Sequence, residues 1–185
     1  MLSPAFDRAA QFAIDKHREQ RRKGTSVPYV THLFAVAALV GEHGGDEEQM
    51  IAGLLHDSIE DQGVTEAELV DAFGPRVARI VVACTDSHET PKPPWKARKT
   101  AYLGELRDKP SDVKLVSACD KLHNARSIAR DLADPSVGAG VWSRFTAPRD
   151  ETLWYYRSLV DALRQGFPHH VVDELAAVVA ELERG

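Results

Sequence analysis

The stretch AGLLHDSIED, residues 52–61, decides how this chain folds, because an apolar helix runs directly into a polar cluster. Its first four residues are apolar, and His56 and Asp57 follow at once. Glu60 and Asp61 come four residues later, one helical turn from His56 and Asp57 respectively. Because the C-terminal end of a helix is itself partially negative, carboxylates gathered there favour a bound cation. A solvated acidic turn at a helix end is the alternative.

The composition is that of an ordinary soluble protein with enough apolar material for a core. The chain has 185 residues, of which 43% are hydrophobic and 28% are charged, which predicts a single domain over residues 1–185. The net charge of −5 disfavours nucleic acid as a partner. The oligomeric state stays open.

Compartment and membrane association follow from local features. The longest apolar run, residues 33–41, is far shorter than the ~20 residues that span a bilayer. Charges at residues 7–8 lie where a signal peptide would be apolar. Cys84 and Cys119 lie far apart in apolar surroundings and form no CxxC pattern. We therefore expect a cytoplasmic protein with no membrane partner.

Helical periodicity extends over almost the whole chain. Capping patterns mark four helix starts, at Ser3, Asp46, Thr65 and Ser111. Loops are expected at about 86–94 and 134–148. No segment alternates with period two, so the expected fold class is all-α, with roughly eight to ten helices. The expected helices cover about 4–17, 31–40, 46–57, 65–73, 75–84, 95–107, 111–131 and two segments after residue 148.

Two residues outside the opening stretch extend the polar cluster. His32 lies on an apolar helix, where a hydrogen-bonded core histidine is the alternative to a ligand. Asp120 follows the apolar segment 115–119 and would be costly to bury without a partner. Asn124 and Ser127 share its helix face, at i+4 and i+7.

His32, His56, Asp57 and Asp120 together supply two imidazoles and two carboxylates. Such a mixed nitrogen and oxygen set with open positions suits Mn²⁺, Mg²⁺ or Fe²⁺ better than a closed structural zinc site.

Four motifs carry a resemblance over about residues 5–165. They are Arg21-Arg22-Lys23 with Pro28-Tyr29-x-x-His32, His56-Asp57-x-x-Glu60-Asp61, Phe73-Gly74 leading to Thr85-Asp86, and Asp120-Lys121-Leu122-His123-Asn124-x-Arg126-Ser127. In this order they resemble the HD superfamily of metal-dependent phosphohydrolases. Within it, the chain is similar to small alarmone hydrolases and to the hydrolase domain of bifunctional (p)ppGpp synthetase-hydrolases. The resemblance implies an HD-type helical bundle.

The chain also departs from that pattern. Leu33 stands where a proline usually follows the first histidine, and the basic loop before Tyr29 is short. Ser127 stands where threonine is common, and residues 91–99 do not match the alarmone enzymes. These departures leave the metal ligands intact and the substrate open.

The resemblance implies release of the 3′-pyrophosphate of (p)ppGpp by a metal-activated water, with Mn²⁺ as the ion. His32, His56, Asp57 and Asp120 would be the metal ligands, and Glu60 and Asp61 the catalytic pair that orients the water and takes its proton. The candidate substrate-binding residues are Arg22, Lys23, Tyr29, Lys121, Asn124 and Ser127. Further cations that could face the substrate are Lys96, Arg98, Lys99 and Arg126. Of these four together with Arg22, Lys23 and Lys121, about half are expected to be plain surface.

Two alternatives remain at this stage. One is an HD phosphohydrolase with another nucleotide substrate, such as a nucleotidase that acts on deoxynucleoside monophosphates; those enzymes share the four ligands but lack the Glu60-Asp61 pair in this arrangement. The other is a non-catalytic module that senses a nucleotide, whose signature would be a lost ligand or a lost acidic pair.

Overall fold

The computed structural model describes residues 1–86, 91 and 93–184, and this part of the chain consists of helices joined by loops. It forms ten α-helices, one 3-10 helix and no strand, which confirms the all-α prediction. The elements are α1 (Pro4–Lys16), α2 (Val30–Glu42), α3 (Glu47–Leu55), α4 (Ser58–Gln62), α5 (Glu66–Phe73), α6 (Pro75–Cys84), α7 (Trp95–Leu106), α8 (Ser111–Ala133), η1 (Gly138–Arg144), α9 (Arg149–Arg164) and α10 (His170–Arg184). No helix of the described residues is both long and apolar enough to cross a membrane.

Local capping fixes three of the helix starts as predicted. The Ser3 side chain accepts a hydrogen bond from the first turn of α1. Asp46 and Thr65 each begin a complete capping box, in which side chain and backbone exchange hydrogen bonds across three residues. These boundaries therefore follow from short-range chemistry alone.

Three expectations need correction. Ser111 is not a cap: it is the first residue of α8, and Pro110 holds the cap position without a side-chain hydrogen bond. The short helix α4 follows Asp57, where no separate helix was expected, and the loop expected at 134–148 contains η1. Of the loop expected at 86–94, residues 87–90 and 92 lie outside the described residues.

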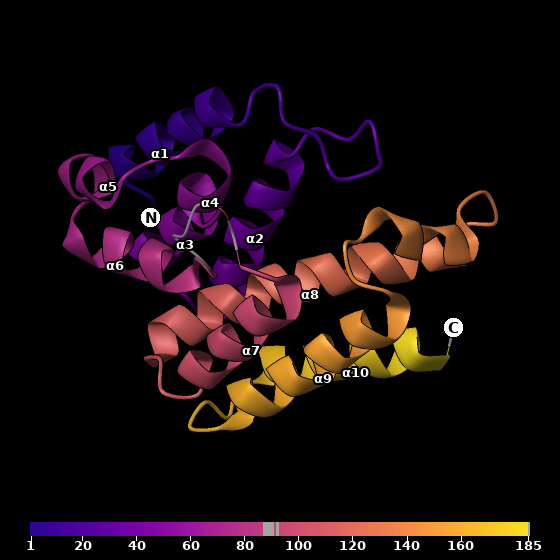
Figure 1. The fold of residues 1–185 in the computed structure, drawn as a ribbon. Helices are drawn as coiled ribbons and strands as arrows, with labels where there is room; N and C mark the ends of the chain where they lie inside the picture. The colour runs from indigo at the N-terminus through magenta and orange to yellow at the C-terminus, as the bar shows by residue number, and fades with distance from the viewer. Residues whose placement is uncertain (87–90, 92, 185) are drawn as a thin grey trace.

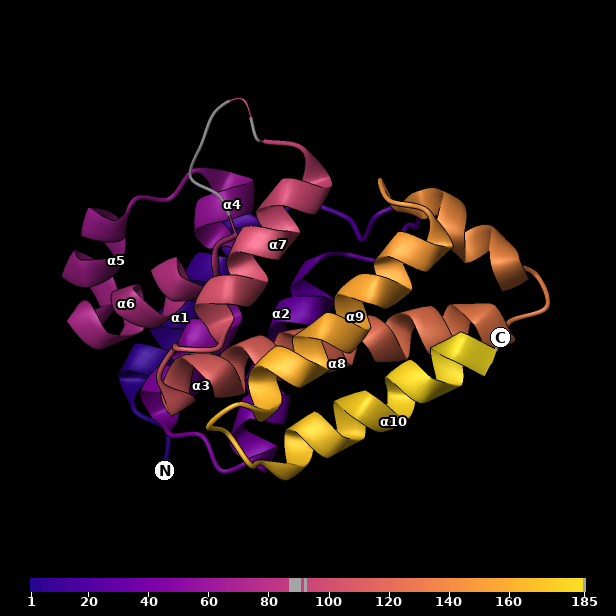
Figure 2. The ribbon, with the colours of Figure 1, turned by 60° about the horizontal axis from the view of Figure 1, so that its bottom comes forward.

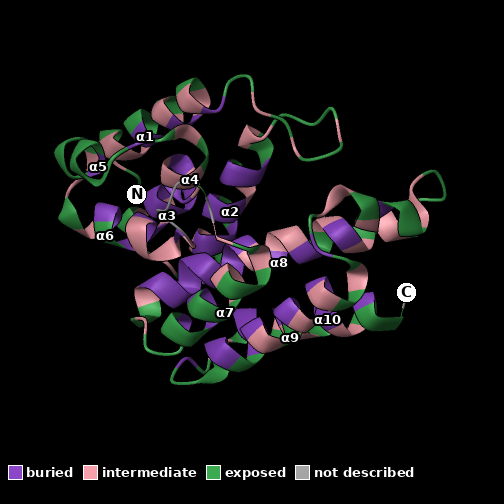
Figure 3. Ribbon diagram, viewed as in Figure 1, coloured by how far each residue is buried: buried purple, intermediate pink, exposed green. Residues whose placement is uncertain are grey.

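The long helix α8 is the centre of the arrangement. Figure 1 shows it crossing the molecule, with α1–α6 on one side and the pair α9 and α10 on the other. Figure 2 shows α9 and α10 running beside it. It packs against α2, α3, α6, η1 and α10, and eleven of its residues are buried. Buried residues gather where α2, α3 and α8 meet (Figure 3), and the candidate site lies at this junction.

A glycine sets how closely two of these helices approach. A Cβ atom at Gly53 of α3 would lie 3.2 Å from Cα of Ala37 on α2, closer than ordinary van der Waals contact. This contact is to backbone, which cannot turn aside as a flexible side chain can. His56 lies one turn beyond Gly53, so the approach also places the candidate site.

We expect Gly53→Val to lower the free energy of unfolding by about 1–3 kcal/mol, because the added methyl groups must push α2 and α3 apart. Chemical denaturation monitored by circular dichroism measures it. Gly104→Val is the matched control, since nothing lies within 4 Å of a Cβ atom at that helical position. Equal stability of the two variants would contradict the tight helix contact.

Candidate active site

Four of the predicted site residues converge where three helices meet. His32 lies on α2, His56 and Asp57 follow the end of α3, and Asp120 lies on α8. Nε2 of His32 is 3.2 Å from Oδ1 of Asp120, and Nε2 of His56 is 2.8 Å from Oδ2 of Asp57. One ligand atom each from His32, His56 and Asp120 lies within 4.8 Å of the others. The structure thus brings together side chains up to 88 positions apart.

The backbone of α3 sets the orientation of the His56 ring. Nδ1 of His56 lies 2.8 Å from the carbonyl oxygen of Gly53. A carbonyl oxygen only accepts, so Nδ1 is the donor and its proton is fixed there. Nε2 is then left to face the carboxylates, which is the tautomer that a metal-binding histidine needs.

His123 plays the same part for the second imidazole. Its Nδ1 lies 2.7 Å from Nδ1 of His32, so one ring must donate to the other. Burial, followed by the charges of His32 and Arg22, lowers the pKa of His123 to about 4. His123 is therefore neutral at neutral pH, and its Nδ1 can accept a hydrogen bond from Nδ1 of His32. In that tautomer the Nε2 lone pair of His32 points into the cluster.

The two carboxylates are supported by hydrogen-bond donors. Tyr29 donates from its hydroxyl to Oδ2 of Asp57 at 2.6 Å. Lys121 and Asn124 donate to the two oxygens of Asp120, at 2.5 and 2.6 Å. A buried carboxylate stays charged only with such partners.

Charge within the cluster overrides burial. Burial alone would raise the pKa of Asp57, but the charge and hydrogen bond of His56 hold that pKa below its ordinary value. Lys121 and His56 do the same for the pKa of Asp120. Conversely, the two carboxylates raise the pKa of His56 well above its ordinary value although burial opposes the charge. The cluster therefore attracts positive charge.

The donor set fits a divalent metal ion. Nε2 of His32 and Nε2 of His56 are both buried and have no hydrogen-bond partner of acceptable geometry. Buried polar atoms are rarely left unpaired, and these two face carboxylate oxygens that are themselves metal ligands by type. Two imidazole nitrogens with carboxylate oxygens match the mixed coordination expected from the sequence.

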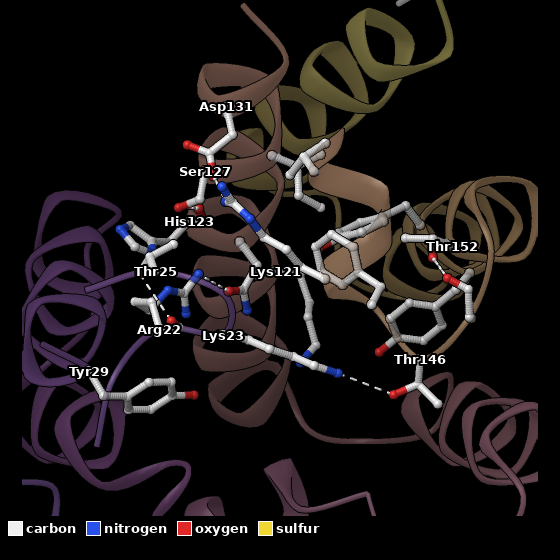
Figure 4. A pocket seen from close by; sticks show the side chains of 18 of the residues that line it. Arg22, Lys23, Thr25, Tyr29, Lys121, His123, Ser127, Asp131, Thr146 and Thr152 are labelled. Carbon is white, nitrogen blue, oxygen red and sulfur yellow. Dashed lines mark hydrogen bonds and ion pairs between the residues drawn. The ribbon is translucent and has the colours of Figure 1, made fainter. Parts of the chain in front are cut away.

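A cavity of about 820 Å³ lies beside this cluster. Its lining includes all six predicted substrate-binding residues and also Glu60 and His123. Figure 4 shows the side chains from α8 facing those from the loop after α1 and from the region around η1 and α9. Seven of the described residues that line it are cationic: Arg22, Lys23, Arg98, Lys99, Lys121, Arg130 and Arg144.

The basic loop is held by its own backbone. The amide of Arg22 donates to the carbonyl of Val27 at 2.8 Å, and the amide of Tyr29 donates to that of Gln20 at 2.9 Å. The Arg22 side chain reaches Oδ1 of Asn124 at 2.8 Å. Lys23 extends across the cavity to Thr146, 3.3 Å away (Figure 4).

The other predicted residues take varied positions. Ser127 lines the cavity and donates to the carbonyl of His123 on its own helix. Tyr29 also lines the cavity, with its ring stacked on His17 at 5.5 Å between centroids. Glu60 lines the cavity as well, whereas Asp61 lies beside it and accepts a 2.7 Å hydrogen bond from Gln20. Burial, followed by the charge of Asp57, raises the pKa of Asp61.

Two of the four further cations lie away from the cavity lining. Lys96 lies over the Trp154 ring, and Arg126 pairs with Glu174. Arg98 and Lys99 do line the cavity, and both pair with Asp86, at 2.6 and 2.5 Å. Of the seven candidate cations, five line the cavity, more than the half expected to face the substrate.

Sequence reasoning missed three lining residues, Arg130, Arg144 and Trp95, which no motif marked. The two arginines lie after the last motif residue. Of the segment Trp154-Tyr155-Tyr156, which the spacing predicts as helix core and from which the resemblance implies one aromatic near the nucleotide, Tyr155 and Tyr156 line the cavity. Gln20 was missed because it lies between helices, where no periodicity operates.

Comparison with protein families and with curated proteins gives consistent matches. A family model described as "HD domain" matches residues 9–152. A Xenopus tropicalis protein named guanosine-3′,5′-bis(diphosphate) 3′-pyrophosphohydrolase MESH1 is 38% identical over 125 residues, which cover 66% of this chain and 68% of that protein. A Drosophila melanogaster protein of the same name is 30% identical over 165 residues, covering 88% and 86% of the two chains. The chain matches only 18% of an Aquifex aeolicus protein named guanosine-3′,5′-bis(diphosphate) 3′-pyrophosphohydrolase, at 36% identity over 123 residues.

Solved structures agree with these matches. One, described as a metazoan ortholog of SpoT that hydrolyzes ppGpp, superposes with a TM-score of 0.79 at 28% identity, covering 100% of this chain and 98% of that one. The protein lmo0812 of Listeria monocytogenes superposes with a TM-score of 0.76 at 30% identity, covering 83% and 99%.

We expect Asn124→Ala to lower the free energy of unfolding of the metal-free protein by about 1–3 kcal/mol, because it removes hydrogen bonds to both Asp120 and Arg22. Ser127→Ala is the matched control on the same helix face, since its hydroxyl bonds only to its own helix. Denaturant titration of the two variants measures the difference. A loss no greater for Asn124→Ala than for Ser127→Ala would show that this link carries no stability.

Proposed function

Because the chain belongs to the HD domain family, we propose that it is a metal-dependent phosphohydrolase that releases the 3′-pyrophosphate of (p)ppGpp. One observation carries the proposal. Two buried imidazole nitrogens without hydrogen-bond partners face two carboxylates at the edge of a cavity lined by cations. The names of the relatives support the choice of substrate.

The ion would be held by His32, His56, Asp57 and Asp120, and we propose Mn²⁺. Carboxylate oxygens suit Mn²⁺ and Mg²⁺, and imidazole nitrogens suit Fe²⁺, so the mixed ligand set is compatible with each of these ions. We choose Mn²⁺ among them on the resemblance to the alarmone hydrolases. A divalent ion bound there lowers the pKa of a coordinated water and polarises a phosphoryl oxygen.

Protein groups around the ligands would handle the water and its proton. Glu60 lines the cavity and is therefore placed to orient the water and accept its proton. Asp61 is held beside it by Gln20 and supports the same step. His123 and the Gly53 carbonyl keep the two imidazoles in the ligand tautomer throughout.

The cavity suits a small and highly anionic molecule. Its volume of about 820 Å³ falls within the ~300–1,000 Å³ usual for small-ligand sites. Arg22, Lys23 and Lys121 offer charge-assisted hydrogen bonds to phosphate groups. Asn124 and Ser127 offer polar contacts to the ribose or phosphate, and Tyr29 offers an aromatic surface near the base. Cations concentrated in a cleft also attract such a substrate despite the net charge of −5.

We expect Asp120→Asn and His56→Ala to lose the bound metal together with activity, because each removes a ligand. Glu60→Gln and Asp61→Asn should keep stoichiometric metal while turnover falls by about 10²–10⁴-fold, as for a lost acid or base group. Elemental analysis of purified protein and a steady-state assay with ppGpp and Mn²⁺ separate the two classes. Asp150→Asn, at an exposed position, is the control.

The ligand assignment is wrong if Asp120→Asn or His56→Ala, loaded with Mn²⁺ as the only metal, retains one Mn²⁺ ion per chain. Loss of metal from Glu60→Gln or Asp61→Asn would instead make that residue a ligand. Circular dichroism shows whether each variant is folded.

We expect Arg22→Ala combined with Lys23→Ala to raise KM for ppGpp by tenfold or more and to lower kcat much less. The reason is that each charge-assisted hydrogen bond contributes about 1.5–3 kcal/mol to binding, whereas neither residue touches the metal ligands directly. The defect should deepen as salt screens the remaining charges. Lys16→Ala with Arg18→Ala, which removes the same charge at residues that do not line the cavity, should leave KM unchanged.

Product analysis decides the substrate. Equimolar pyrophosphate and GDP from ppGpp support the proposal. Inorganic phosphate from a nucleoside monophosphate, with no pyrophosphate from ppGpp, would identify a nucleotidase that uses the same metal site.

A further inference from the structure

A second histidine cluster lies away from the candidate active site. His43 ends α2, and His169 and His170 lie at the start of α10. Nδ1 of His43 is 2.8 Å from Nε2 of His170, and the ring of His169 lies 5.0 Å from that of His170 between centroids. One ring nitrogen from each of the three residues lies within 4.8 Å of the other two. None of the three has a part in the proposed reaction.

A carboxylate lies beside this cluster. Glu174 lies one helical turn after His170, and its Oε1 is 4.0 Å from Nε2 of His170 and 3.8 Å from Nε2 of His43. Arg126 donates to the other oxygen of Glu174 at 2.6 Å. The arginine thus fixes the carboxylate with Oε1 turned toward the histidines.

The cluster joins one buried histidine to two histidines that solvent can reach. His43 is 7% exposed, whereas the side chain of His170 is 65% exposed. A cavity of about 330 Å³ is lined by His169 and His170 and gives small ions access to the cluster. Among the described residues, these rings take part in one other hydrogen bond, in which the Val171 amide donates to Nδ1 of His169 over 3.3 Å.

The spacing of the nitrogens suits a tetrahedral ion. Two ligands at about 2.0–2.1 Å from a tetrahedral zinc lie about 3.3 Å apart. The 2.8 Å between His43 and His170 would have to open by about half an ångström, which a partly exposed side chain can do by a small rotation.

We propose that His43, His169 and His170 form a second metal site, for Zn²⁺, with the fourth position left to water. Three imidazoles are a ligand set typical of zinc, whereas Mg²⁺ and Mn²⁺ prefer oxygen. The site joins the end of α2 to the start of α10. His43 lies eleven residues after His32 on α2, about 16 Å along the helix, so this ion is separate from the catalytic one.

Zinc titration of full-length, untagged and metal-free protein tests the proposal. The unaltered chain should bind two Zn²⁺ ions, because zinc also enters the His32–Asp120 cluster. Asp120→Asn and His170→Gln should each bind one, and the double variant none. In the Asp120→Asn background, Zn²⁺ should raise Tm, and His169→Gln or His170→Gln should weaken zinc binding by about 100-fold or more.

The variants are chosen so that folding does not decide the result. His169 and His170 are half-buried and exposed, so glutamine at either position leaves the core intact. Glu181→Gln, at an exposed position of the same helix, should bind zinc as the unaltered chain does. The proposal is overturned if Asp120→Asn with His170→Gln still binds one Zn²⁺ with unchanged affinity, or if Asp120→Asn alone binds none. Neither result depends on which nucleotide the enzyme cleaves.

Discussion

The rest of this structure depends on the burial of two carboxylates, Asp57 and Asp120, against two imidazoles at the junction of α2, α3 and α8. Charged groups removed from water are costly unless every oxygen and nitrogen has a partner. Here Tyr29, Lys121 and Asn124 supply donors, and the His56 ring, whose pKa the two carboxylates raise, faces both of them. Two ring nitrogens remain without hydrogen-bond partners, so the junction is complete only when a cation joins it. The same four side chains therefore join the three helices and supply the ligands for an ion.

The central helix α8 connects structure to chemistry. One face of it is buried against four other α-helices and η1, which fixes its position in the molecule. Its opposite edge carries Asp120 into the cluster and Lys121, Asn124 and Ser127 to the cavity. Because these side chains are on one rigid helix, the distance between the metal cluster and the phosphate-binding groups is set by helix geometry rather than by a loop. Asn124 couples the two regions directly, since it bonds to Asp120 on one side and to Arg22 on the other.

The main cavity and the cavity beside the histidine cluster differ in the charges that line them. The chain is acidic overall, yet the described lining of the main cavity contains seven cations and only two acidic residues. Several of these cations are already paired with carboxylates, as Arg98 and Lys99 are with Asp86. Such pairs hold the side chains in place before substrate arrives, which lowers the entropy lost on binding. The smaller cavity beside the histidine cluster is lined by one cation, Arg164, and one acidic residue, Asp173, among the described residues.

The sequence by itself determined most of the helices and brought forward the four candidate ligands. Capping boxes at Asp46 and Thr65 act over three residues, and apolar periodicity identifies which face of a helix is buried. Both signals are local, so they can be recognised in the sequence. The same logic placed His32, His56, Asp57 and Asp120 at the ends of apolar runs. Only the tertiary structure decided what meets across helices: His123 with His32, Gln20 with Asp61, and His43 with His170, the last pair 127 residues apart. Periodicity states that a face is buried but not against which partner, because the partner is chosen by the packing of all the helices together.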